Sequence, residues 1–187
     1  MPTQLGIINN ALLMVGANSI NTLSDSSREA RTAAAIYSTT LNDIISRHPW
    51  TFTLGQIKLA QLQQEPLFGF EHAYQLPVDP EVIRVIRKNN PASDYQIYQD
   101  KLFTNDNEVE ILYQFNPGEE AFPAYFTRLV ELELAKMFAF MLLQDETQAQ
   151  VFDGLMTRQM RAARTIDSQN DPPAQIDAKQ FALTAVR

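Results

Sequence analysis

The sequence predicts an α+β fold that is mainly helical, with a core of about four helices and a small inserted antiparallel β region. Two observations lead to this prediction. Near both ends of the chain, apolar residues recur at intervals of three and four, which is typical of amphipathic helices. Between residues 50 and 115, short segments alternate apolar and polar residues and are separated by turn residues, which indicates strands.

The first two helices are expected at residues 3–16 and 26–48. Gly16 suits the C-cap of the first helix, and Pro49 ends the second because proline disfavours helical geometry in the residue before it. Their apolar positions follow helical spacing: Leu5, Ile8, Leu12 and Val15 in the first, and Ala30, Ala33, Ala34, Tyr37, Leu41, Ile44 and Ile45 in the second.

Residues 50–115 are expected to form the antiparallel β region. Turns are predicted at residues 99–100 and 105–107, where polar turn formers separate the apolar runs. The clearest strand follows the second turn, because its apolar residues occupy every second position: Val109, Ile111 and Tyr113.

The last two helices are expected at residues 124–143 and 146–166. The helix at 124–143 is apolar on most sides, so it is either central in a bundle or part of a contact between subunits. The helix at 146–166 has a narrower apolar side, expected to face inward: Ala149, Phe152, Met156, Ala163 and Ile166. With the preceding elements, these helices complete one domain over residues 1–166.

Residues 167–187 are expected to form an extended C-terminal arm that starts as a proline-containing linker. The arm carries apolar residues that have no helical partner in the sequence: Ile176, Phe181, Leu183 and Val186. Such residues are interpreted as contacts with a neighbouring subunit or another partner. Deleting 171–187 is expected to abolish that attachment and to leave the helical content of the chain nearly unchanged.

Composition argues against several functions. The formal net charge is −7, which is unlike the basic balance of proteins that bind nucleic acid tightly. The chain has no cysteine, so disulfides and thiolate metal sites are excluded. No phosphate-binding, dinucleotide-binding, nucleophile-elbow or zinc-protease motif occurs, and no cofactor or membrane span is expected. Together these absences predict a protein that is not an enzyme.

Three arginines share one side of the last predicted helix: Arg158, Arg161 and Arg164. The simpler interpretation is a solvated face whose positive charge suits the negative end of the helix dipole. The alternative is an interface, where arginine is an effective anchor.

Trp50 is the only tryptophan of the chain and follows the predicted helix end at Pro49. A ligand platform, an intersubunit contact and a core anchor are the three possible roles. We interpret Trp50 and Phe52 as structural anchors that hold the second helix to the β region. In a rival interpretation, Trp50 and the loop 62–72 would line a ligand pocket of a monomeric binding module.

Several motifs, in a fixed order, resemble a known family. They are NNALLMVGANSINTLSD, SRHPWTF, YQLPVDPEVIRV, YQIYQDKLFTND, EVEILYQF and FPAYF. In this order they resemble the head-to-tail adaptors of short-tailed bacteriophages, a family also called tail tubular protein A or the tail accessory head-completion adaptor. The resemblance covers residues 5–166.

The resemblance implies a structural virion protein at the head–tail junction, made in the cytoplasm of the bacterial host. It implies a homo-oligomeric ring of about twelve copies beneath the portal protein, on which the tail nozzle or tube docks. Genomic DNA would pass through the ring without sequence-specific binding, and the family has no catalytic residues to transfer. A tail component that docks on the tail alone is the nearest alternative.

Overall fold

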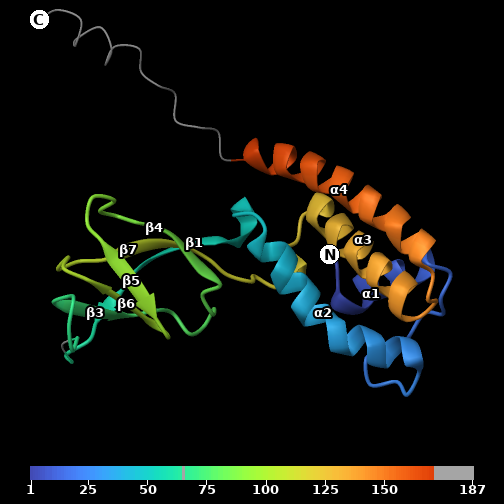
Figure 1. The fold of residues 1–187 in the computed structure, drawn as a ribbon, viewed down its shortest axis with the longest axis horizontal. Coiled ribbons are helices and arrows are strands. Elements are labelled where there is room, and N and C mark those ends of the chain that lie inside the picture. The colour runs from blue at the N-terminus through green and yellow to red at the C-terminus, as the bar shows by residue number, and fades with distance from the viewer. Residues whose placement is uncertain (65, 171–187) are drawn as a thin grey trace, which may run out of the picture.

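The computed structural model describes residues 1–64 and 66–170, and it shows an elongated chain with two lobes (Figure 1). A helical lobe contains α1 (Gln4–Met14), α2 (Arg28–Ser46), α3 (Ala124–Met141) and α4 (Glu146–Ser168). All the strands lie in a separate β lobe, inserted between α2 and α3. The predicted α+β class, with a mainly helical chain and a small inserted antiparallel β region, is confirmed. The predicted arm residues Ile176, Phe181, Leu183 and Val186 lie outside the described part of the chain.

Three of the four helices begin with a side chain that caps their free backbone N–H groups. Thr3 accepts a hydrogen bond from the backbone of Gly6 at α1, and Ser27 caps α2 in the same way. At α4 the cap is Asp145, whose carboxylate also suits the positive end of the helix dipole. Polar residues in the loops therefore fix where these helices start.

Helix α3 is the centre of the helical lobe. It packs against α1, α2 and α4, and α4 runs along it (Figure 1). The sequence left two alternatives for this helix, a central place in a bundle or a contact between subunits. The first holds for most of α3, because the side chains from Phe126 to Ala139 are largely buried within the chain. Only its last turn exposes large apolar groups.

Two small sheets make up the β lobe. The first has the strand order β1-β7-β4, from β1 (Leu54–Lys58), β7 (Glu110–Gln114) and β4 (Arg84–Lys88). The second has the order β2-β3-β6-β5, from β2 (Ala60–Gln61), β3 (His72–Gln75), β6 (Lys101–Thr104) and β5 (Tyr95–Tyr98). Every pairing is antiparallel among the described strands.

The two sheets bury a second hydrophobic core that is separate from the helical one. Its residues come from both sheets and the loops beside them: Leu59, Tyr74, Leu76, Leu102, Val109, Ile111 and Tyr113. Val109, just before β7, and Ile111 and Tyr113 within it all point into this core, as the predicted alternation requires. The alternation fails at the end of the strand, where Gln114 is also buried. The β lobe therefore has apolar packing of its own.

The predicted boundaries need several corrections. Helix α1 ends at Met14 and has Val15 as its C-cap in place of Gly16, and α2 spans Arg28–Ser46 in place of 26–48. Helix α3 ends at Met141, and Leu142 serves as its C-cap. Residues 51–53 form a 3₁₀ turn, so the first strand starts at Leu54. Helix α4 continues to Ser168, past the predicted end at residue 166, so Asp167 and Ser168 belong to the helix and not to the arm.

The inward side of α4 also differs from the prediction at its last turn. Ile166, expected inside, is exposed, whereas Asp167 is buried. Its carboxylate has enough hydrogen-bond donors around it to offset the loss of water.

In the part of the chain that the structure describes, no helix is both long and apolar enough to cross a membrane.

Candidate functional site

Trp50 belongs to the helical core. Its side chain is completely buried, and its indole N–H donates a hydrogen bond to the carbonyl of Ile44 at 3.2 Å. Its ring meets those of His48 and Phe126 edge-on, with centroids 4.7 and 5.3 Å away. These partners are all on or beside helices, so Trp50 joins α2 to α3 rather than to a sheet. Trp50 does not line the pocket beside the loop 62–72 that the rival interpretation required.

Phe52 packs in the same aromatic group. Its ring lies 4.8 Å from that of Phe126 and 5.9 Å from that of Phe122, both edge-on. Phe122 and Phe126 in turn meet at 4.9 Å. The start of α3 is therefore held by aromatic rings contributed by the segment that follows α2.

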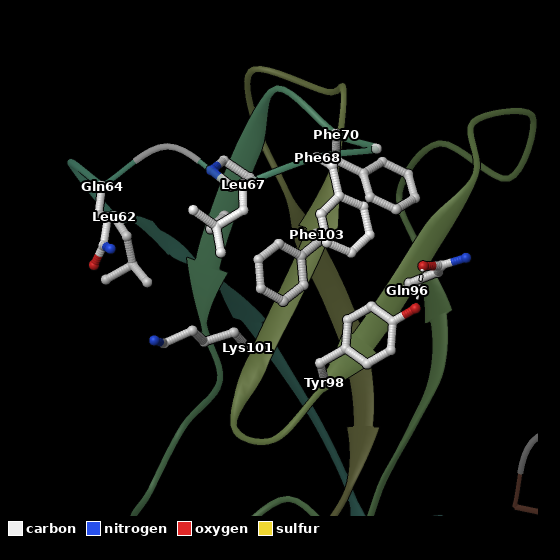
Figure 2. A pocket seen from close by; sticks show the side chains of 12 residues that line it. Leu62, Gln64, Leu67, Phe68, Phe70, Gln96, Tyr98, Lys101 and Phe103 are labelled. Atoms are coloured by element: carbon white, nitrogen blue, oxygen red, sulfur yellow. Dashed lines mark hydrogen bonds between the residues drawn. The ribbon is translucent and has the colours of Figure 1, made fainter.

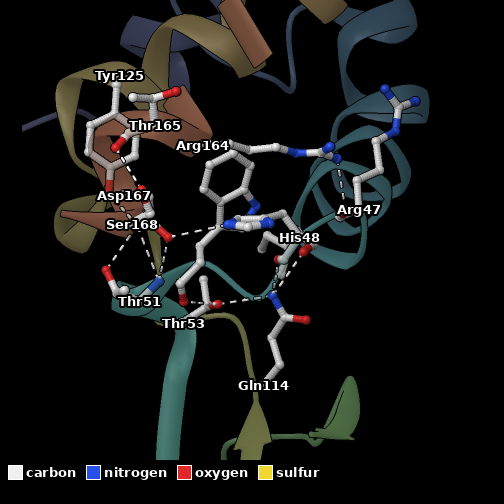
Figure 3. Close-up of polar contacts among 12 residues, drawn as sticks. Arg47, His48, Thr51, Thr53, Gln114, Tyr125, Arg164, Thr165, Asp167 and Ser168 are labelled. Atoms are coloured by element: carbon white, nitrogen blue, oxygen red, sulfur yellow. Dashed lines mark hydrogen bonds and ion pairs between the residues drawn. The ribbon is translucent and has the colours of Figure 1, made fainter. Parts of the chain in front are cut away.

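The connection between the lobes is made by Gln114, the last residue of β7 (Figure 3). Its buried side-chain amide donates to the carbonyls of Ile45 and His48, at 2.8 and 2.7 Å, and lies 3.0 Å from the hydroxyl of Thr53. Its amide oxygen accepts a hydrogen bond from Arg84 at 2.8 Å. One glutamine thus adds side-chain hydrogen bonds to two carbonyls at the end of α2, which also accept from the backbone N–H groups of Trp50 and His48.

Asp167 is a second buried polar centre at the same junction (Figure 3). Its carboxylate is about 1% exposed and accepts hydrogen bonds from the backbone N–H of Thr51 at 3.1 Å, the Thr51 hydroxyl at 2.9 Å and the Tyr125 hydroxyl at 2.7 Å. Burial and the bond to Asp167 raise the pKa of Tyr125, so this phenol stays protonated. The carboxylate holds the last turn of α4 against both the start of α3 and the 3₁₀ turn before β1.

His48 lies beside Asp167, with Nε2 3.5 Å from the carboxylate. Burial lowers the pKa of His48, and the attraction to Asp167 opposes that shift only in part. At neutral pH the imidazole is therefore neutral.

This acid–histidine pair does not form the arrangement used in nucleophilic catalysis. The hydroxyls of Thr51 and Tyr125 both donate to Asp167, and neither is bonded to His48. A general base acts from within hydrogen-bond reach of the group that it deprotonates, directly or through one water. The contacts instead satisfy one buried carboxylate and position helix ends. Among the described residues, no group of three or more acidic or histidine side chains could hold a metal ion.

The depressed pKa of His48 predicts a specific pH dependence of stability. The unfolded chain takes up a proton at His48 near pH 6.5, whereas the folded chain resists it until a lower pH. The contribution of His48 to folding is thus present above pH 6.5 and lost as the pH falls through the folded value. His48→Gln should flatten the fall in urea-unfolding midpoint between pH 7 and the acid range. An unchanged slope would contradict the assignment.

The predicted arginine stripe lies on the solvent side of α4. Arg158, Arg161 and Arg164 are all exposed. Arg164 donates a hydrogen bond to the carbonyl of Arg47 at 3.1 Å, so it helps to cap the end of α2. The interface role of the stripe stays a prediction.

The β lobe exposes a large apolar surface at the loop between β2 and β3. Leu67 and Phe68 are 93% and 84% exposed, and we call them the β-end surface. They flank a pocket of about 250 Å³ on the outer side of the second sheet (Figure 2). Phe70, Tyr98 and Phe103 contribute aromatic rings to its lining, and Lys101 contributes a charge. The rival interpretation placed a pocket beside this loop, and one is present there without Trp50.

The helical lobe exposes a second apolar surface at the turn between α3 and α4. Phe140, Met141 and Leu143 are between 40% and 57% exposed, and we call them the helical-end surface. Phe140 also lines an open groove of about 350 Å³ between α3 and the start of α4. The α3–α4 turn lies at one end of the long axis of the subunit, and the loop before β3 lies at the other end (Figure 1).

Sequence reasoning missed Gln114 and Asp167, because polar residues were assigned to the solvent side of each element. No protein-family model matches the chain, and the search of curated proteins finds no match either.

Proposed function

We propose that this chain is a structural subunit of a virion, a head-to-tail adaptor of a short-tailed bacteriophage. Copies would form a closed ring beneath the portal, extend the channel for DNA and offer a docking surface to the tail. The proposal starts from the ordered motifs that resemble this family. The geometry adds one observation in its support, namely that apolar surfaces are exposed at the two opposite ends of an elongated subunit.

Two different apolar surfaces suit a connecting subunit. Contiguous exposed apolar groups in a soluble protein usually mark contacts with other macromolecules. Here the β-end surface and the helical-end surface differ in composition and are far apart along the long axis, so they favour two different partners.

The acidic balance of the chain is compatible with this role. With a net charge of −7, the ring would repel the phosphates of DNA and would not retard its exit, as a basic channel would. Gln114 of β7 bonds to the end of α2 and Asp167 fastens the end of α4 at the same junction, so the contacts support a defined arrangement of the two lobes. A rigid spacer is what an adaptor between two rings requires.

Single charges placed at each end test the proposal. Phe68→Asp should weaken binding to one of the two partners, portal ring or tail nozzle, at least about tenfold, and Phe140→Asp should weaken binding to the other. Val78→Asp is the matched control, because Val78 is an exposed apolar residue outside both surfaces. Binding is measured by surface plasmon resonance with the purified partners of the same phage. If neither substitution affects either partner, the two-ended contact is refuted.

A tail component that docks on the tail alone is the competing proposal. It predicts that the portal ring does not bind the chain under any condition, and that only one of the two end surfaces responds to substitution. The same binding series therefore separates the two proposals.

A further inference from the structure

Strand β5 is an open edge of the second sheet. It pairs with β6 on one side, and it is the last strand in the order β2-β3-β6-β5. All four of its residues are exposed, among them Tyr95, Ile97 and Tyr98. Edge strands are usually protected by charges, proline or a bulge, because their free backbone groups pair readily with another chain. The Tyr-Gln-Ile-Tyr sequence of β5 has no charge or proline, so the edge is suited to accept a further strand.

The aromatic pocket lies directly beside this edge. Gln96 and Tyr98 of β5 contribute to its lining, and their cross-strand partners Phe103 and Lys101 do so as well (Figure 2). These side chains share the outer side of the sheet, because partners in a ladder point to the same side. A strand added along β5 would therefore place every second side chain next to the pocket. Main-chain pairing supplies affinity in such complexes, and the pocket supplies specificity.

The C-terminal sequence of the chain has the pattern that such a site requires. It ends in Phe-Ala-Leu-Thr-Ala-Val-Arg, residues 181–187, in which Phe181 and Leu183 stand two positions apart. Side chains two positions apart share one side of a strand. Phe, Leu, Thr and Val are apolar or β-branched, and the only charged side chain of this stretch is at its end. We propose that residues 181–186 of one copy add to β5 of a neighbouring copy, with Phe181 and Leu183 at the aromatic pocket.

A neighbouring copy is the better source of this strand than the same copy. Helix α4 ends at the junction of the lobes, where Asp167 bonds to Thr51, whereas the pocket is beside the loop at the far end of the β lobe (Figure 1). The chain from Asn170 to Phe181 reaches at most about 40 Å when fully extended. A linker of that reach lets the segment extend beyond its own copy to an adjacent one. This inference rests on the proposed ring, which brings copies next to one another.

The absence of cysteine permits a direct test by cross-linking. Full-length chains with Gln96→Cys are mixed with full-length chains that carry Leu183→Cys, and a short bismaleimide is added. The mixture is studied alone at high concentration and with the portal ring of the same phage. The inference predicts a cross-linked dimer of unlike chains at about tenfold or more the yield of a control mixture, because docking raises the local concentration of the thiols. The control pairs Gln150→Cys, exposed on α4, with Leu183→Cys.

Two further variants make the result specific. Ala182→Cys in place of Leu183→Cys should give a lower yield, because position 182 would point to the other side of the added strand. Phe181→Asp introduced into the Leu183→Cys chains should remove the dimer, because a carboxylate would enter an aromatic pocket. Gln96 and Gln150 are exposed and lie outside both buried cores, so chains changed at these positions are expected to fold.

The outcomes separate this inference from the proposed function. A dimer of unlike chains supports strand addition between copies. If the dimer forms but the chain does not bind the portal, the adaptor role fails and the inference stands. A yield equal to the control overturns the inference, whether or not the portal is bound. A separate chain that carries both Gln96→Cys and Leu183→Cys tests the alternative. A cross-link that forms only within that chain also overturns the inference, because the segment would then occupy its own copy.

Discussion

Trp50→Ala is expected to lower the free energy of unfolding by about 3–5 kcal/mol, the usual loss for a large aromatic side chain removed from a core. Trp50 is completely buried, and its removal would leave a cavity between α2 and α3. The substitution would also leave the carbonyl of Ile44 without its hydrogen bond. The loss is measured by urea unfolding followed by circular dichroism, since the variant has no tryptophan to report fluorescence.

Two comparisons make the Trp50 result interpretable. Trp50→Phe keeps an aromatic ring but not the N–H donor, and it should cost clearly less than Trp50→Ala. Leu13→Ala removes an exposed apolar side chain of α1 and should change stability little. A loss of less than about 1 kcal/mol for Trp50→Ala, combined with failed assembly, would show that Trp50 acts in a contact between subunits instead.

Asp167→Ala is expected to cost a similar amount, about 3–5 kcal/mol, for a different reason. Three donors would lose their acceptor: the backbone N–H of Thr51, its hydroxyl, and the hydroxyl of Tyr125. Buried donors without partners are more costly than the bonds themselves are stabilising. The last turn of α4 should come loose from the junction, so its amide hydrogens should exchange faster than those of the first turns.

The control for Asp167 uses the same helix. Asp167→Asn retains one side-chain oxygen as an acceptor and should destabilise less than alanine, whereas Arg158→Ala on the exposed side should have little effect. Equal effects of Asp167→Ala and Arg158→Ala would show that the carboxylate does not hold the end of α4. Unchanged hydrogen exchange in that turn would lead to the same conclusion.

The sequence predicted the elements whose burial follows a simple period. The helices were found because their apolar side chains recur every three to four residues, and β7 was found because it alternates. The near-continuous apolar surface of α3 was compatible with two alternatives, a central place in the bundle and a contact between subunits. In each of these cases, the position of the apolar side chains on the element was enough to predict its type.

The parts that were missed depend on contacts between residues far apart in the sequence. Gln114 bonds to residues 61 to 69 positions away, and Asp167 bonds to Thr51 across 116 positions. A polar residue is assigned to the surface unless its partners are known, so neither pattern nor propensity could reveal these two. The error at Ile166 has the same cause, because Asp167 occupies the inward position at the end of α4. The arrangement of the strands in two sheets was likewise not predictable from the local pattern.

Native mass spectrometry tests the central claim most directly. The chain is measured alone and after mixing with the portal ring of the same phage. The proposed adaptor role predicts a complex in which about one copy of this chain is bound per portal subunit, with neighbouring copies in contact around the ring. If the chain does not bind the portal at any concentration, and binds only a tail component or nothing, the adaptor role is contradicted.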